Sequence, residues 1–144
     1  MLFRSWSYQV NAGSGNNAFS YYLYSQGRWG FSPWDKPEVY MNESALTHAP
    51  QVSQPILIMH GTADPTVAFQ EGLSYYQALR FNKKEAYLLA YPGEGHGLRG
   101  LANRRDLTIR YFQFFDHYLK GAPAPKWMTE GVPFLVKETV KEPR

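Results

Sequence analysis

A carboxylate and an imidazole follow two short apolar runs of this 144-residue chain, at the point where each run ends. Asp64 follows the run at residues 56–59, which His60 and Gly61 close, and His96 stands in a glycine-rich segment just after residues 86–91. Runs this short and this apolar are typical of buried strands in a parallel sheet. In such sheets, ligands and chemistry are found in the loops beyond the carboxyl ends of the strands. The spacing therefore predicts an imidazole base with an acid that orients it.

Each of the two residues also has a purely structural interpretation. Asp64 could cap the helix expected after it, and His96 could be an ordinary loop histidine. The pairing of the two after successive strands favours the chemical interpretation, because a base and its orienting group must meet. The glycines on both sides of His96 are expected to let the chain turn sharply enough to aim its ring.

Two strands and an intervening helix are predicted to bring the acid and the imidazole together. Apolar residues recur at helical spacing over residues 68–81, between the two strands, so the unit is predicted to be a βαβ crossover with parallel strands. The strand at residues 56–59 is expected to be covered on both faces. The loops that follow such neighbouring strands can meet.

A second long helix is predicted near the carboxyl end of the chain. Asn103 and Asp106 have the spacing of a helix cap, apolar residues then form a helical face to Lys120, and Gly121 supplies the stop. We expect this helix to cover the sheet. The fold class is therefore α/β, with residues 1–121 as one partial domain and residues 122–144 as a proline-containing, extended tail.

The amino-terminal third of the chain offers weaker signals. A short helix is predicted at about residues 18–26, followed by an irregular, aromatic-rich segment to residue 40 that is expected to form a lid or pocket wall. One more helical turn is expected within residues 42–50.

The composition excludes several classes of function. The hydrophobic share of 44% and the charged share of 19% indicate a globular fold. The formal charge of +3 comes without any block of like charge, so no nucleic-acid partner is indicated. No apolar segment approaches the roughly 20 residues that span a bilayer. The absence of cysteine excludes disulfides, thiolate metal sites and cysteine nucleophiles.

Residues 60–64 read His-Gly-Thr-Ala-Asp, and residues 91–97 read Tyr-Pro-Gly-Glu-Gly-His-Gly. These two motifs together resemble the prolyl oligopeptidase family of serine peptidases, which includes dipeptidyl and acylaminoacyl peptidases. The resemblance implies an α/β-hydrolase fold, whose triad order is Ser, Asp, His. It also implies that Asp64 is the triad acid and His96 the triad base, that the substrate is a peptide, and that neither metal nor organic cofactor takes part. Tyr24 and Val67 would line the pocket for the residue before the scissile bond, and His60 would be structural.

The family's nucleophile elbow, G-x-S-x-G, does not occur in these 144 residues. Ser14 lies between two glycines, but Ala12 and Asn16 stand where the motif needs glycine. We therefore expect a carboxyl-terminal fragment of the hydrolase domain that lacks the amino-terminal portion of the same enzyme and is inactive alone. Self-association through an unpaired strand edge is also expected. The compartment, cytoplasmic or exported, stays open because any signal is expected upstream.

Two alternative functions remain open at the level of sequence. One is an esterase or lipase of the same fold, since an Asp and a His serve both reactions. The other is a nucleophile-less relative that acts as a binding module.

Overall fold

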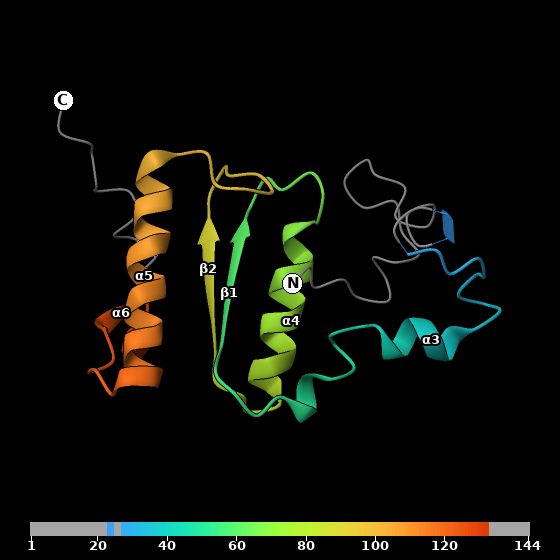
Figure 1. Cartoon of the computed structure of the whole chain (residues 1–144), viewed down its shortest axis with the longest axis horizontal. Helices are drawn as coiled ribbons and strands as arrows, with labels where there is room; N and C mark the ends of the chain where they lie inside the picture. The colour runs from blue at the N-terminus through green and yellow to red at the C-terminus, as the bar shows by residue number, and fades with distance from the viewer. Residues whose placement is uncertain (1–22, 25–26, 133–144) are drawn as a thin grey trace. The chain divides into compact units, whose positions relative to one another are not determined.

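The computed structural model describes residues 23–24 and 27–132, which divide into two compact units with the boundary between Arg104 and Arg105. The first unit contains the short helices α3 (Pro37–Asn42) and η2 (Ala49–Gln51), then β1 (Ile56–Gly61), α4 (Phe69–Phe81), β2 (Ala86–Tyr91) and the first turn of α5 (Leu101–Lys120) (Figure 1). The second unit contains the rest of α5 and α6 (Lys126–Thr129). The helix predicted at residues 18–26 lies largely outside the described residues.

The two strands are parallel, and each residue of one strand lies opposite a residue of the other. Ile56 lies opposite Ala86 at one end of the pair, and Gly61 lies opposite Tyr91 at the other. Helix α4 connects them, so the predicted βαβ crossover is confirmed (Figure 1). Both strands therefore end at the same edge of the sheet. Within the described residues the sheet has two strands, and self-association through a free edge stays a prediction.

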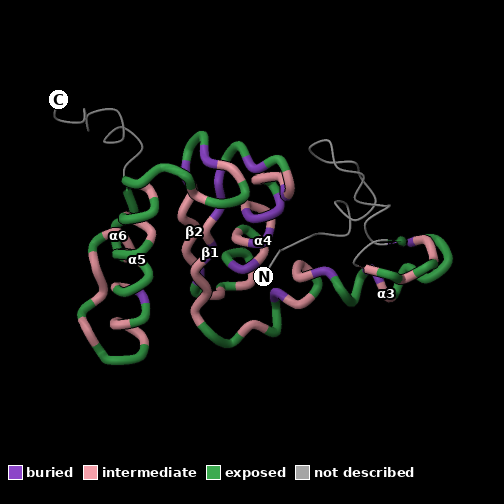
Figure 2. Tube along the Cα trace, turned by 45° about the horizontal axis from the view of Figure 1, so that its top comes forward, coloured by how far each residue is buried: buried purple, intermediate pink, exposed green. Residues whose placement is uncertain are grey.

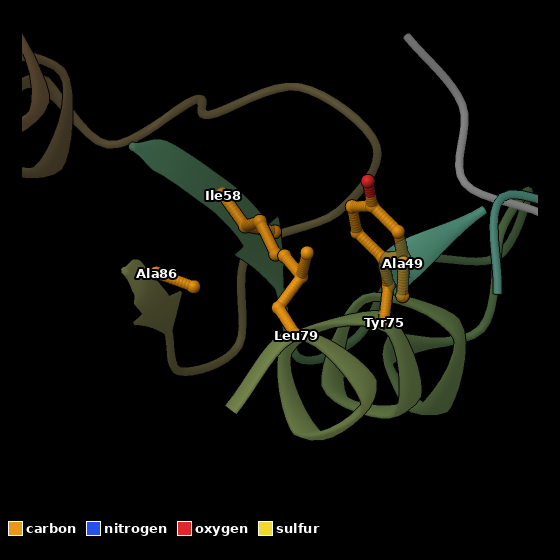
Figure 3. Close-up of a cluster of buried hydrophobic side chains, with 5 residues drawn as sticks. All are labelled: Ala49, Ile58, Tyr75, Leu79 and Ala86. Atoms are coloured by element: carbon orange, nitrogen blue, oxygen red, sulfur yellow. The ribbon is translucent and has the colours of Figure 1, made fainter. Parts of the chain in front are cut away.

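Helix α4 and the sheet enclose the core of the first unit. Leu79 points from α4 toward Ile58 of β1, and Tyr75 lies one helical turn earlier (Figure 3). The buried cluster consists of Ala49, Ile58, Tyr75, Leu79 and Ala86. Leu57 and Met59, which alternate to the opposite face of β1, are only half-buried. Helix α4 packs against one face of the strand, and the covering of the other face stays a prediction.

The end of α4 is set by its own carboxyl-terminal groups. The Asn82 side-chain amide donates to the Ala78 carbonyl at 2.8 Å, and Lys83 takes a left-handed φ of 57°. The Lys84 N–H then bonds the Leu79 carbonyl at 2.9 Å, which satisfies an orphan carbonyl of the last turn. This turn returns the chain to the sheet at Ala86.

Helix α5 begins earlier than the sequence predicts. It starts at Leu101 rather than after an Asn103 cap, and the Asn103 side chain instead donates to Glu94 at 2.6 Å. The capping interpretation is therefore wrong, because a tertiary acceptor takes the side chain. The predicted end is confirmed: the helix stops at Lys120, and Gly121 follows with a φ of 71°.

The aromatic segment before the sheet packs on itself. The Tyr40 ring is fully buried, meets the Trp29 ring edge-on at 4.5 Å between centroids, and donates its hydroxyl to the Phe31 carbonyl at 3.0 Å. Helix α3, which carries Tyr40, has Pro37 at its first position, where proline is favoured. That this segment forms a lid or pocket wall stays a prediction.

The second unit is built around α5. Phe114 is the residue of this helix that is buried, and most others are half-buried or exposed (Figure 2). The tail predicted to be extended contains the helical turn α6, and its Trp127 indole donates to Gln113 of α5 at 2.7 Å. A domain boundary after residue 121 and the covering of the sheet by α5 stay predictions. No helix in the described part of the chain is long and apolar enough to cross a membrane.

Candidate functional site

The loops after β1 and β2 are joined at the carboxyl edge of the sheet. Thr62 donates its N–H to the Tyr91 carbonyl at 3.0 Å and accepts the Gly93 N–H on its hydroxyl at 3.0 Å. One residue further, the Ala63 N–H bonds the Glu94 carbonyl at 3.0 Å. Three hydrogen bonds made by two consecutive residues of the first loop hold the two loops side by side, immediately before Asp64 in the chain.

Gly61 allows this close approach. A Cβ built on Gly61 would lie 2.3 Å from the carbonyl oxygens of both Glu94 and Gly95. Such a separation is far inside ordinary contact, and both neighbours are backbone atoms that cannot rotate away. Only glycine fits at this point unless the loops move apart.

Asp64 and His96 meet at the end of these loops. The His96 Nδ1 lies 2.9 Å from the Asp64 Oδ2, and the other carboxylate oxygen accepts the backbone N–H groups of Thr66 and Val67 at 2.8 and 3.0 Å. Because a carboxylate only accepts, His96 donates from Nδ1, and the lone pair of the neutral ring is on Nε2. The Asp64 side chain is 4% exposed, whereas that of His96 is 44% exposed.

The environment of Asp64 favours its charged form. Burial by itself would raise the pKa of this carboxyl, but the hydrogen bonds from Val67, His96 and Thr66 outweigh it and lower the pKa below the usual value. Asp64 is therefore a carboxylate at neutral pH. It does not cap α4, which begins at Phe69 after Ala68 and has no side-chain cap.

His60 contacts the turn at residues 64–67 through its side chain. Its Nε2 donates to the Val67 carbonyl at 2.9 Å and lies 3.4 Å from the Asp64 Oδ2. The ring is buried against α4, where a Cβ on Gly72 would come within 2.4 Å of the His60 Nδ1. His60 thus has a structural place in the site.

The glycine of the second loop that takes a left-handed conformation is not one of those beside His96. Gly93 has a φ of 73°, whereas Gly95 and Gly97 do not take a left-handed φ. A Cβ on Gly97 would meet nothing within 4 Å, and one on Gly95 would make only ordinary contact with Pro65. The chain turns at Gly93 and bends again at His96 and Gly97, so the expectation that the flanking glycines aim the ring stays a prediction.

Glu94 is a site residue that the sequence reasoning missed. Its buried carboxylate accepts the Arg99 N–H at 2.7 Å, the Gly100 N–H at 3.0 Å and the Asn103 amide at 2.6 Å. A signal was available, because an acid two residues before a candidate base and shortly before a predicted helix has several backbone donors within reach.

The two predicted pocket residues fare differently. Val67 is 2% exposed and belongs to the Asp64 turn through its backbone, whereas Tyr24 is 79% exposed. No hydrogen bond or ring contact among the described residues joins Tyr24 to Asp64, His96 or Val67. Their role in a pocket stays a prediction.

The other two histidines are occupied by local contacts. The His48 Nδ1 lies 2.9 Å from the Gln51 amide oxygen, and the His117 Nδ1 donates to the Ala122 carbonyl at 2.7 Å. Across the described residues, no group of three or more acidic, histidine or cysteine side chains is arranged to hold a metal ion.

Among the sequence relatives, one is named as an enzyme that releases acylamino acids and another as a dipeptidyl peptidase. The chain is 38% identical to the acylamino-acid-releasing enzyme of Rattus norvegicus over 61 residues, which are 42% of this chain and 8% of that protein. It is 26% identical to dipeptidyl-peptidase 5 of Porphyromonas endodontalis over 115 residues, covering 72% of this chain and 16% of that protein. The matched part is therefore a small fraction of the length of these relatives.

A solved structure and a family-wide comparison agree with the sequence relatives. A puromycin-hydrolyzing peptidase of Mycobacterium tuberculosis superposes with a TM-score of 0.58 at 23% identity, covering 74% of this chain and 16% of that one. The predicted fold is thereby confirmed as part of an α/β-hydrolase. The prolyl oligopeptidase family matches residues 10–122. The resemblance seen in the two motifs is thus confirmed, and the chain belongs to the prolyl oligopeptidase family, a family of serine peptidases.

Proposed function

We propose that Asp64 and His96 are the acid and base of a Ser-Asp-His triad in an enzyme that hydrolyses peptide bonds. The hydrogen bond of 2.9 Å between the His96 Nδ1 and the Asp64 Oδ2 carries this proposal. It joins a buried carboxylate that is held by two backbone N–H groups to a half-exposed imidazole whose Nε2 carries the lone pair.

The chemistry follows from that tautomer. As a serine oxygen attacks the carbonyl carbon of the scissile bond, the His96 Nε2 takes the serine proton and the ring becomes a cation. Asp64 keeps Nδ1 protonated and stabilises the cation. The Nε2 proton then passes to the leaving amine, and water repeats the sequence to release the acyl group and restore the serine. The G-x-S-x-G motif does not occur in these residues, so we propose that the serine lies on another part of the same enzyme.

The substrate is proposed on the family and on the names of the relatives. One relative is named for releasing acylamino acids and another as a dipeptidyl peptidase. We therefore propose that a short segment at the amino end of a peptide is the acyl group transferred to the serine. Tyr24 and Val67 remain the proposed contacts for its last side chain.

The test begins with the DNA upstream of the Met1 codon, translated in frame. A frame that continues to a G-x-S-x-G sequence defines a longer enzyme, which is expressed and assayed with peptidyl and N-acyl-aminoacyl p-nitroanilides and with p-nitrophenyl esters. In it, His96→Gln and Asp64→Asn are expected to lower kcat/KM for the anilides by about 10⁴-fold. His48→Gln and Asp116→Asn are the matched controls and are expected to change it less than about threefold.

Three results would count against the proposal, each in a different way. A loss of less than about tenfold in both site variants would show that Asp64 and His96 are not the acid and base. Hydrolysis of the esters without the anilides would indicate the esterase or lipase alternative. A stop codon in frame directly upstream, with no serine motif, would favour the binding-module alternative.

A further inference from the structure

Glu94 closes a short ring of the chain that contains His96. Its carboxylate, two residues before the imidazole, accepts the backbone N–H groups of Arg99 and Gly100, three and four residues after it. The Asn103 side chain adds a third donor to the same oxygen that Gly100 uses. The segment from residue 94 to residue 100 therefore has both ends tied to one buried carboxylate.

The backbone of Glu94 is tied to the loop that carries Asp64. Its carbonyl accepts the Ala63 N–H at 3.0 Å, and its N–H donates to the Tyr91 carbonyl at 3.3 Å. The same carbonyl oxygen is one of the two that would lie 2.3 Å from a Cβ on Gly61. Glu94 thus contacts the acid's loop through its main chain and the start of α5 through its side chain.

We propose that Glu94 is a positioning residue, which holds the His96 ring at hydrogen-bond distance from Asp64 by closing the 94–100 ring. Gly95 and Gly97 lie beside the imidazole and have backbone freedom that no side chain restricts, so another constraint has to fix the ring. The three donors supply it. This proposal rests on the proposed function, in which His96 is the base.

The charge state of Glu94 suits this role. The Asn103 and Arg99 hydrogen bonds lower the pKa of Glu94 despite its burial, with smaller contributions from Gly100 and the Arg104 charge. The ring is therefore closed by a carboxylate at neutral pH. A carboxylate accepts all three hydrogen bonds, whereas an amide of the same shape places an N–H₂ group against one of the donors.

The first test is kinetic and uses the longer enzyme. Glu94→Gln leaves Gly100 and Asn103 an acceptor oxygen but opposes the Arg99 N–H with a donor. We expect kcat to fall by about 10- to 100-fold with KM unchanged, because the base is displaced while substrate binding is retained. Asn103→Ala, which removes one donor, is expected to have a smaller effect in the same direction. The exposed Glu38→Gln is the matched control and is expected to leave both constants unchanged.

The second test uses the 144-residue chain at micromolar concentration and does not depend on catalysis. Peptide-level hydrogen–deuterium exchange is measured for the wild type, Glu94→Gln and Leu79→Ala. Glu94→Gln is expected to speed exchange in residues 61–67 and 92–100 and to leave α4 and β2 unchanged. Leu79→Ala, which destabilises the core of the unit, is expected to speed exchange throughout it instead.

The outcomes separate this proposal from the proposed function. Unchanged exchange in both loops of Glu94→Gln would overturn the positioning role. So would an equal fall in kcat in Glu94→Gln and in Leu79→Ala, measured below the unfolding temperature of Leu79→Ala. Faster loop exchange in Glu94→Gln together with full activity in His96→Gln would instead overturn the proposed function and leave the positioning role standing.

Discussion

Replacing Gly61 by alanine tests the geometry on which the site depends. The new Cβ would lie 2.3 Å from the carbonyl oxygens of Glu94 and Gly95. Relief to an ordinary carbon–oxygen separation of about 3.3 Å requires the two loops to part by roughly 1 Å. That movement stretches the Ala63 to Glu94 hydrogen bond, which is 3.0 Å long, and draws His96 away from Asp64.

The expected cost has two parts. Overpacking against atoms that cannot rotate away costs about 1–3 kcal/mol, and a weakened loop-to-loop hydrogen bond costs about 1 kcal/mol more. Gly61→Ala is therefore expected to lower the free energy of unfolding by about 2–4 kcal/mol. At this chain length the melting temperature is expected to fall by roughly 4 °C for each kcal/mol, or about 8–16 °C.

The assay is urea and thermal unfolding of the chain, followed by circular dichroism. Gly97→Ala is the matched control, because its Cβ meets nothing within 4 Å and its backbone is not left-handed. It is expected to change the free energy of unfolding by no more than about 0.5 kcal/mol. Midpoints measured at two protein concentrations must agree, so that association does not contribute. If Gly61→Ala unfolds like Gly97→Ala, the loops do not approach each other in the way described, and the argument that places His96 by loop packing fails.

Three further predictions concern the supports of the site and the core. Gly72→Ala puts a Cβ 2.4 Å from the His60 Nδ1, so it is expected to destabilise by about 1–2 kcal/mol in urea unfolding although alanine normally favours a helix; a stabilised variant would contradict it. Leu79→Ala is expected to cost about 2–5 kcal/mol, against about 0.5 kcal/mol or less for the exposed Leu119→Ala; equal losses would show that Leu79 is not in the core. The pKa of Asp64 is lowered on folding, so its contribution to stability is complete above the unfolded pKa of about 3.9 and is lost as pH falls through the lower folded pKa. The stability gap between wild type and Asp64→Asn is thus expected to be constant from pH 7 to 5 and to shrink toward pH 2, and a gap that widens in acid would refute this.

The elements that place the site could be predicted because their signals are local. The strand at residues 86–91 and the helix ending at residue 81 have the predicted bounds, since an apolar run and a helical stripe depend on neighbours within a few residues. The meeting of Asp64 and His96 followed from the same signals, because parallel strands in a crossover end at one edge. Proline at the first position of α3 was a further local signal that could have located that helix.

The features that the sequence did not predict depend on hydrogen bonds between residues that are not neighbours in the sequence. Asn103 has the type and spacing of a helix cap, but Glu94 provides a charged acceptor nine residues away and takes its side chain. Likewise, the left-handed turn at Gly93 was not predicted, and its N–H donates to Thr62 of the preceding loop, 31 residues earlier. The sequence shows which groups need a hydrogen-bond partner, whereas the tertiary structure determines which partner each group has.

The proposed acid and base lie in two different environments. Burying a carboxylate costs free energy unless hydrogen bonds compensate its charge. Asp64 accepts hydrogen bonds from two backbone N–H groups and one imidazole N–H, all within 3.0 Å. An imidazole that exchanges protons with a substrate must instead keep one nitrogen accessible, and the His96 side chain is 44% exposed. The hydrogen bond between them crosses that boundary, so its length depends on the backbone that joins the two loops rather than on either side chain. Changes at Gly61 and Glu94, which bear no proton in the proposed reaction, should therefore lengthen this hydrogen bond although neither residue belongs to the pair.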